Sequence, residues 1–226
     1  MGGEDPLGTF GIARAAVDDT VSGFVGLVLQ PDPATIRTSY ALADRVMAPD
    51  AEQRLASGSL PHVTLTQCVL RNAPRHRLAT FVGPLRSELR DRAIPLTSVT
   101  VFGGGFVVWG VDAAAPARSM LVRAHEDALP LADGFLDDIA NAAVVEATAR
   151  ATGDDPDLVD NARRYGYAFA RRHYLPHITL GFDRRLVAAG RDRPWRHVDQ
   201  RHTMLVADVV VARLGPLGRV TAVLSL

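Results

Sequence analysis

Lysine is absent from this chain, and all 25 basic residues are arginine. The absence excludes three kinds of chemistry that need a lysine amine: a P-loop phosphate site, a pyridoxal Schiff base, and ligation through a lysyl-adenylate. Cys68 is the single cysteine. An intramolecular disulfide and a cysteine-rich metal cluster are therefore excluded, in keeping with a reducing compartment.

An excess of charge and long apolar runs are also missing. The formal net charge of the 226 residues is zero, so the chain lacks the positive field of a protein that binds long nucleic acid through its phosphates. No run approaches the roughly 20 apolar residues of a membrane span, and residues 1–19 lack the apolar core of a signal peptide. We therefore expect a cytoplasmic monomer with neither a membrane nor long nucleic acid as a partner.

The first half of the chain mixes strand and helix patterns. "GFVGLVLQPD", residues 23–32, is a continuous apolar run of the length of a buried strand. Residues 33–47 keep helical spacing and stop before Pro49. A helix is also predicted over 75–92, where Gly83-Pro84 should kink or split it.

The later elements continue the mixture: strands at 94–102 and 106–112 around a turn at 103–105, a helix at 117–129, two helices within 133–173, and a terminal hairpin across 215–218. Asp155 and Pro156 have the residue types of an N-cap and a first helical turn. No low-complexity linker divides the chain. The order predicts one α+β domain over residues 1–226, with a curved, mostly antiparallel sheet flanked by helices and a helical insertion at 133–173.

One six-residue sequence occurs twice. "LPHVTL" occupies residues 60–65 and "LPHITL" residues 175–180. Because side chains alternate along a strand, His62 and Thr64 should share one face, and so should His177 and Thr179. If the two halves of the chain pack symmetrically, two imidazoles and two hydroxyls converge on one central cleft. By the same alternation Thr66 and Cys68 would lie on the face of His62 and line the bottom of that cleft.

Two imidazoles that face each other suit a phosphodiester. A neutral imidazole accepts a proton from the attacking oxygen, a protonated one donates a proton to the leaving oxygen, and the hydroxyls hold the non-bridging oxygens. The sequence contains no His-x-His, HExxH or clustered carboxylates, so we expect neither a metal nor another cofactor. The competing interpretation is a pair of structural histidines on ordinary strands.

Paired H-x-T-apolar motifs, each on a strand, resemble the two-histidine (2H) phosphoesterase superfamily, in particular its branch of 2′-5′ RNA ligase-like proteins and 2′,3′-cyclic phosphodiesterases. The resemblance implies a two-lobed, pseudo-symmetric fold. It also implies that His62 and His177 are the catalytic acid and base and that Thr64 and Thr179 bind phosphate.

The implied function is a metal-independent phosphodiesterase. Its substrate would be a cyclic phosphate or a 2′-linked phosphodiester of a nucleotide, an RNA end or a nucleotide-derived metabolite. A non-catalytic nucleotide-binding module that uses the same cleft is the alternative.

The residues around the second copy are further candidates for substrate binding. Arg171, Arg172 and Tyr174 precede His177 closely, and we expect them to contact substrate, with the segment 133–173 setting substrate choice. The competing interpretation has the arginines complement a helix end and Tyr174 pack in the core or at its rim.

After the second copy, many bacterial members of the superfamily carry a basic residue. Here Phe182 lies near that position, and Arg184 and Arg185 follow. Four histidines, His76, His125, His197 and His202, receive no predicted role.

Overall fold

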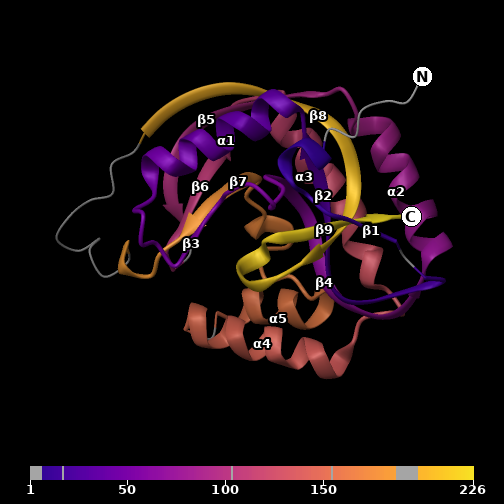
Figure 1. Ribbon diagram of the computed structural model, residues 1–226. Coiled ribbons are helices and arrows are strands. Elements are labelled where there is room, and N and C mark those ends of the chain that lie inside the picture. Colours follow the sequence, from indigo (N-terminus) through magenta and orange to yellow (C-terminus); the bar gives the residue numbers. More distant parts are fainter. Residues whose placement is uncertain (1–6, 17, 103, 154, 187–197) are drawn as a thin grey trace, which may run out of the picture.

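The computed structural model describes residues 7–16, 18–102, 104–153, 155–186 and 198–226 (Figure 1). Gly103 of the predicted turn and His197 lie outside the described residues. The strands are β1 (Arg14–Ala16), β2 (Thr20–Pro31), β3 (Gln53–Arg54), β4 (Val63–Pro74), β5 (Ala93–Phe102), β6 (Phe106–Val111), β7 (His177–Phe182), β8 (Val198–Leu214) and β9 (Val220–Ser225). The α-helices are α1 (Pro33–Val46), α2 (Arg75–Leu89), α3 (Pro116–Ala128), α4 (Asp138–Thr152) and α5 (Pro156–Tyr165). Short 3-10 helices are η1 (Gly8–Phe10), η2 (Leu129–Ala132), η3 (Arg171–His173) and η4 (Pro216–Gly218).

The strands form one curved sheet whose pairing closes on itself. Its order is β1-β9-β8-β2-β4-β7-β6-β5, and β5 pairs again with β8. The long strand β8 makes this possible, because its first half pairs with β5 and its second half with β2. All pairings are antiparallel except the parallel pair β1–β9. The expected α+β architecture with a curved, mostly antiparallel sheet is confirmed.

Strand β2 is buried on both faces. Val25, Leu27 and Leu29 belong to the larger apolar cluster, whereas Val28 belongs to a second cluster on the other face. A strand that loses water on both sides needs a continuous apolar run rather than an alternating one. This explains why the pattern at residues 23–32 is uninterrupted.

The two halves of the chain repeat one arrangement. In the first half β2 leads through α1 to its antiparallel neighbour β4, and in the second half β6 leads through α3, α4 and α5 to its antiparallel neighbour β7. Strands β4 and β7 are themselves paired, so the halves meet at these two strands. The expected two-lobed, pseudo-symmetric layout follows from this pairing.

Helix boundaries follow local capping. The Asp32 carboxylate accepts hydrogen bonds from the backbone N–H groups of Ala34 and Thr35 at the start of α1. Asp155 caps α5 in the same way, as predicted. Helix α4 lies beside α5 within the segment 133–173 (Figure 1). That this segment is an insertion stays a prediction.

The predicted split of α2 is wrong, because a single helix continues through Pro84. Gly83 and Pro84 are exposed on its outer side. The inner side buries Leu78, Val82, Leu85 and Leu89 at helical spacing. Burial of these side chains outweighs the backbone hydrogen bond that proline removes.

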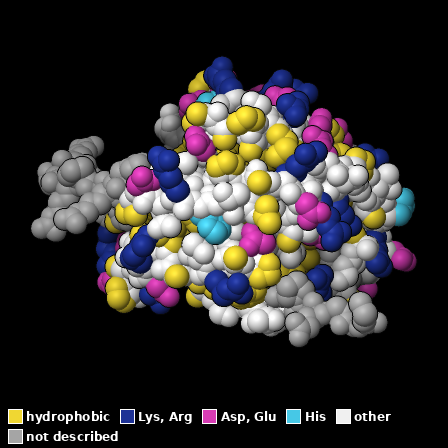
Figure 2. All heavy atoms as spheres, turned by 90° about the horizontal axis from the view of Figure 1, so that it is seen from above, with side chains coloured by type: hydrophobic (Ala, Val, Ile, Leu, Met, Phe, Trp, Pro, Cys, Tyr) yellow, Lys and Arg dark blue, Asp and Glu magenta, His cyan; other side chains and the backbone are white. Residues whose placement is uncertain are grey.

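The surface agrees with the balanced composition. On the face seen in Figure 2, arginine and acidic side chains are interspersed without a broad patch of one sign. Every helix among the described residues is too short or too polar to cross a lipid bilayer.

Candidate active site

The two copies of the repeated sequence lie side by side. We call Leu60–Leu65 the first motif and Leu175–Leu180 the second motif. Val63 of β4 pairs with Ile178 of β7 in an antiparallel register, and both side chains are fully buried. The middle residues of the two motifs therefore face each other across the strands, and an approximate two-fold axis passes between them.

This register brings the polar motif residues together. In an antiparallel pair, one step from the Val63–Ile178 pair sets Thr64 across from His177 and His62 across from Thr179. All four of these side chains are partly exposed and lie on the face opposite the buried pair. The two histidines are diagonal neighbours, a relation that corresponds to about 7–8 Å between Cα atoms.

The Leu-Pro prefix of each motif orients its histidine. Nδ1 of His62 donates a hydrogen bond to the Leu60 carbonyl at 2.8 Å, and Nδ1 of His177 donates one to the Leu175 carbonyl at 2.6 Å. A carbonyl only accepts, so each Nδ1 carries the proton and each Nε2 keeps its lone pair when the ring is neutral. The two rings are thus held in the same tautomer.

The last leucine of the first motif forms a β-bulge. Along the β2–β4 ladder Val28 pairs with Thr64, but Leu27 pairs with Thr66, so Leu65 is the extra residue. A bulge bends the strand and re-aims the side chains that follow it.

The second motif contains the same bulge. Along the β6–β7 ladder Val108 pairs with Thr179, but Val107 pairs with Gly181, so Leu180 is the extra residue. Both motif leucines are fully buried. The repeated sequence therefore forms the same local backbone structure twice: a histidine followed by a strand with a β-bulge at the last leucine.

The bulge overturns one expectation. Thr66 and Cys68 were predicted to share the face of His62, but both are buried, and Cys68 belongs to the larger core cluster. Gln67 is partly exposed instead. The alternation of the strand shifts by one residue at Leu65, and burial raises the pKa of the Cys68 thiol to about 12.

A narrow pocket lies against the first histidine. Its volume is ≈ 20 Å³, which is enough for one water molecule or one phosphate oxygen. His62 and Thr179, which face each other across the strands, both line it. The other walls come from β3 and the segment between it and the first motif, from the start of that motif, from β7 and from the β8–β9 turn, namely Gln53, Leu55, Ser59, Leu60, Gly181, Leu217, Gly218 and Arg219.

Aromatic rings flank the second histidine. The Phe102 ring centroid is 5.6 Å from that of His177 and 5.0 Å from that of Phe169. Both phenylalanines are partly exposed. The His177 end of the site therefore carries aromatic rings, which do not line the pocket at His62.

Both histidines favour their neutral form. The pKa of His62 is lowered to about 4, chiefly because the ring is buried; the hydrogen bond to the Leu60 carbonyl opposes the shift, and the neighbouring His177 adds to it. Burial also lowers the pKa of His177, against the effect of its bond to the Leu175 carbonyl.

Sequence reasoning missed His125, which links the first motif to the segment just before the second motif from the core side. Its Nε2 accepts the backbone N–H of Arg171 at 2.8 Å, so its Nδ1 donates to the Leu65 carbonyl at 2.5 Å. The His125 ring also stacks on Tyr174, with ring centroids 4.0 Å apart. The Tyr174 hydroxyl donates to the Thr64 carbonyl at 2.9 Å. A single histidine within a helical pattern does not indicate from the sequence which backbone groups its ring will bind.

The candidates before the second motif lie away from the small pocket. Tyr174 is buried with its hydroxyl bonded to backbone. Arg172 forms an ion pair with Asp157, and Arg171 reaches the Tyr165 hydroxyl at 3.4 Å. None of the three lines the pocket at His62.

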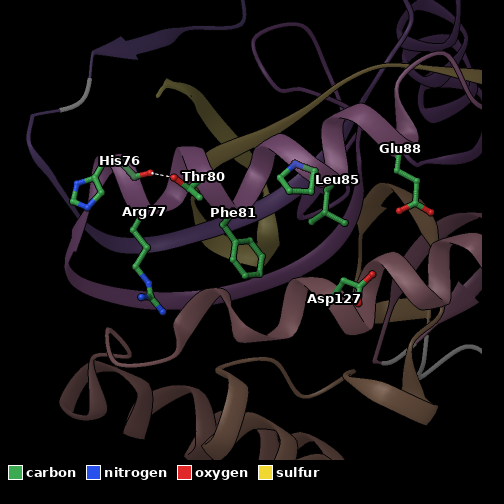
Figure 3. A pocket seen from close by; sticks show the side chains of 8 residues that line it. His76, Arg77, Thr80, Phe81, Leu85, Glu88 and Asp127 are labelled. Atoms are coloured by element: carbon green, nitrogen blue, oxygen red, sulfur yellow. Dashed lines mark hydrogen bonds between the residues drawn. The ribbon is translucent and has the colours of Figure 1, made fainter.

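A wider pocket, of ≈ 580 Å³, is separate from the motifs. It lies between α2 and α3, and Figure 3 shows Phe81 and Leu85 beside its charged rim. No motif residue lines it. Among the described residues, no group of three or more His, Cys, Asp or Glu side chains could hold a metal ion.

Comparison with solved structures finds the same overall fold at low sequence identity. TT0787 of Thermus thermophilus shares it with a TM-score of 0.52 and 17% sequence identity, over 89% of this chain and 95% of TT0787. E. coli LigT complexed with NADP+ gives a TM-score of 0.44 at 13% identity, over 91% of this chain and 99% of LigT. A structure titled only as a phosphoesterase gives 0.46 at 14% identity, over 91% and 97%. No family model and no curated protein sequence matches the chain.

Proposed function

We propose that this protein is a phosphodiesterase in which His62 and His177 perform acid–base catalysis and Thr64 and Thr179 bind the phosphate. The pairing of Val63 with Ile178 carries the proposal, because it brings both histidines and both threonines to one face of the sheet. Structural histidines on two unrelated strands would have no reason to share this register.

The proposed reaction is hydrolysis. Nε2 of one histidine accepts a proton from water as the water oxygen bonds to phosphorus. The phosphorus–oxygen bond to the leaving alcohol breaks, and Nε2 of the other histidine donates a proton to that oxygen. The threonine hydroxyls donate hydrogen bonds to the non-bridging oxygens, where negative charge increases.

The acid needs a proton that the free site holds weakly. Both histidine pKa values are lowered in the free protein. A bound phosphodiester carries a negative charge, which stabilises an adjacent imidazolium and raises its pKa. Substrate therefore helps to create the acid that cleaves it.

The proposed substrates are a 2′,3′-cyclic phosphate or a 2′-linked phosphodiester on a nucleotide, an RNA end or a nucleotide-derived metabolite. The two proton transfers use protein side chains alone, so the activity should not need a divalent metal ion.

A substrate screen in EDTA tests the proposal. Cyclic nucleotides and 2′-5′ and 3′-5′ dinucleotides are incubated with the wild type and with His62→Ala, and products are separated by chromatography. We expect turnover of at least one 2′-phosphodiester by the wild type and loss of turnover in the variant. His76→Ala is the control, because His76 is exposed on α2. Activity that appears only after a metal is added would contradict the proposal.

The nucleotide-binding module is the second candidate, and one observation favours it. Two lowered pKa values leave both imidazoles neutral near pH 7, a state that binds but supplies no acid. Calorimetric binding of nucleotides without turnover of any of them would support this candidate over the enzyme.

A further inference from the structure

The pocket beside His62 has a wall that belongs to neither motif. The turn between β8 and β9 contributes Leu217, Gly218 and Arg219 to it. In Figure 1 the yellow hairpin carries this turn to the middle of the molecule. The turn between β8 and β9 therefore forms part of the candidate active site.

The turn is fixed to the first motif. Leu60, the first residue of that motif, pairs with Val220 immediately after Arg219. The Ser59 hydroxyl donates to the Val220 carbonyl at 3.3 Å, and the Gly215 N–H donates to the Arg219 carbonyl at 2.7 Å. The backbone of Arg219 is thus held at a fixed position relative to His62, and its side chain extends from there.

The turn adopts an uncommon conformation to do this. Leu217 has a φ of 57°, in the left-handed region that non-glycine residues rarely adopt, and its side chain is 40% exposed. Gly218 follows with a φ of 74°, and positive φ at consecutive positions is the geometry of a tight β-hairpin turn. The tight turn keeps Arg219 close to the strand that pairs with the first motif.

The motifs supply no fixed positive charge, although a phosphodiester is an anion. The threonines are neutral, and burial keeps His62 and His177 neutral in the free protein. An additional cation would stabilise the bound anion strongly, because the surrounding protein screens charge less than water does.

The arginines that follow the second motif already have acidic partners. Arg184 forms a two-point ion pair with Glu52, with distances of 2.8 and 2.7 Å. Arg185 binds Asp183 and Asp50, each at 2.7 Å. Neither arginine lines the pocket at His62.

Arg219 differs from them. Its side chain is exposed, and no carboxylate among the described residues lies within ion-pair distance of it. It is also the one arginine that lines the pocket among the described residues.

We propose that Arg219 binds the phosphate group of the substrate, as the fixed cation of a site whose motif residues are neutral. The inference rests on the proposed function and adds a residue from a third part of the chain to it. The guanidinium can donate two N–H groups to one non-bridging oxygen or to two, a geometry that suits phosphate. The ligand class is an anionic phosphodiester or its phosphomonoester product.

Kinetics of Arg219→Gln and Arg219→Lys test the inference. We expect KM for the best substrate to rise about 10- to 100-fold in Arg219→Gln, the loss typical of a charge-assisted hydrogen bond, while kcat changes by less than about threefold. Arg219→Lys keeps the charge and should recover part of the loss. Arg213→Gln is the matched control, since Arg213 lies on the same hairpin and binds the Ser22 carbonyl instead.

Binding of inorganic phosphate, followed by calorimetry, gives a readout that does not require turnover. Arg219→Gln should weaken it at least tenfold, and thermal unfolding should show that the variant folds as the wild type does. Wild-type hydrolysis with an unchanged KM in Arg219→Gln would overturn the inference and leave the proposed function intact. If the wild type neither hydrolyses a phosphodiester nor binds phosphate, both fail. Phosphate binding that Arg219→Gln weakens supports the inference even without turnover.

Discussion

The first and second motifs have nearly the same sequence and the same backbone, yet their surroundings differ. Each holds its histidine through a leucine carbonyl and each has a bulge at its last leucine. Around His62 the β8–β9 turn leaves a pocket the size of one water molecule, whereas His177 lies against the aromatic ring of Phe102. The motif residues are thus arranged symmetrically while the walls around them are not, and under the proposed function this difference would decide which end of a substrate fits where.

The largest expected effect comes from removing either histidine. His62→Ala and His177→Ala should each lower kcat by about 10² to 10⁴, because each removes a positioned acid or base. Because the two histidines would act as one unit, their losses should not add, and kcat of the double variant should be only slightly below that of the less active single variant. Steady-state kinetics and circular dichroism measure this. Full activity in the double variant would show that the symmetric groups do no chemistry.

Stability should depend on His125, which joins the first motif to the segment before the second motif. His125→Phe keeps a ring against Tyr174 but leaves the Leu65 carbonyl and the Arg171 N–H without a partner. We expect the free energy of unfolding to fall by about 2 to 4 kcal/mol, measured by urea denaturation. His76→Phe, at an exposed position, should change it by less than about 0.5 kcal/mol. Equal stability of the two variants would mean that the link is dispensable.

The pH profile of activity tests whether the pKa values of both histidines are lowered. With the pKa of His62 near 4 and that of His177 below 6.5, kcat/KM should peak below pH 6.5 and fall about tenfold per pH unit well above both values. Stability should move in the opposite direction. The unfolded chain binds protons that the folded histidines do not, so stability is lost as the pH falls from 6.5 towards 4.

Replacing either histidine by glutamine should make the stability profile flatter in that pH range, as followed by thermal unfolding. An activity optimum near pH 8 would contradict the assignment of lowered pKa values.

A smaller and matched loss is expected for the two threonines. Thr64→Val and Thr179→Val each remove one hydroxyl that we propose binds phosphate, which corresponds to about a tenfold drop in kcat/KM. The near two-fold symmetry predicts similar losses at both positions. Thr203→Val, on the exposed face of β8, is the control. A large loss at one position with none at the other would show that the symmetry of the backbone does not extend to phosphate binding.

The smallest effect should appear at the aromatic end. Phe102→Leu keeps an apolar side chain but removes the ring beside His177. We expect KM to rise about 2- to 10-fold for substrates with a nucleobase, the range of one aromatic contact, and to stay constant for a phosphodiester without a base. Equal changes for both substrates would assign Phe102 to packing around His177 rather than to substrate.

The sequence predicted a large part of the fold because apolar runs and caps are local signals. The buried strand β2, the cap of α5 at Asp155 and the terminal hairpin all follow from patterns within a few residues. Two expectations were wrong for the same reason. The path of α2 through Pro84 and the burial of Cys68 depend on packing and on strand register, which a local pattern does not contain.

The repeated six residues by themselves determined that each histidine shares one face of an extended segment with a threonine, with an apolar anchor on the opposite face. Only the tertiary structure decided that β4 and β7 are neighbours, that the register places Thr64 across from His177, and that the turn carrying Arg219 closes the other end. Contacts between segments more than a hundred residues apart depend on how the whole sheet closes, and β8 closes it by pairing with both halves of the chain. The sequence specifies which side chains are present, whereas the distance between the motif histidines depends on how the whole sheet is assembled.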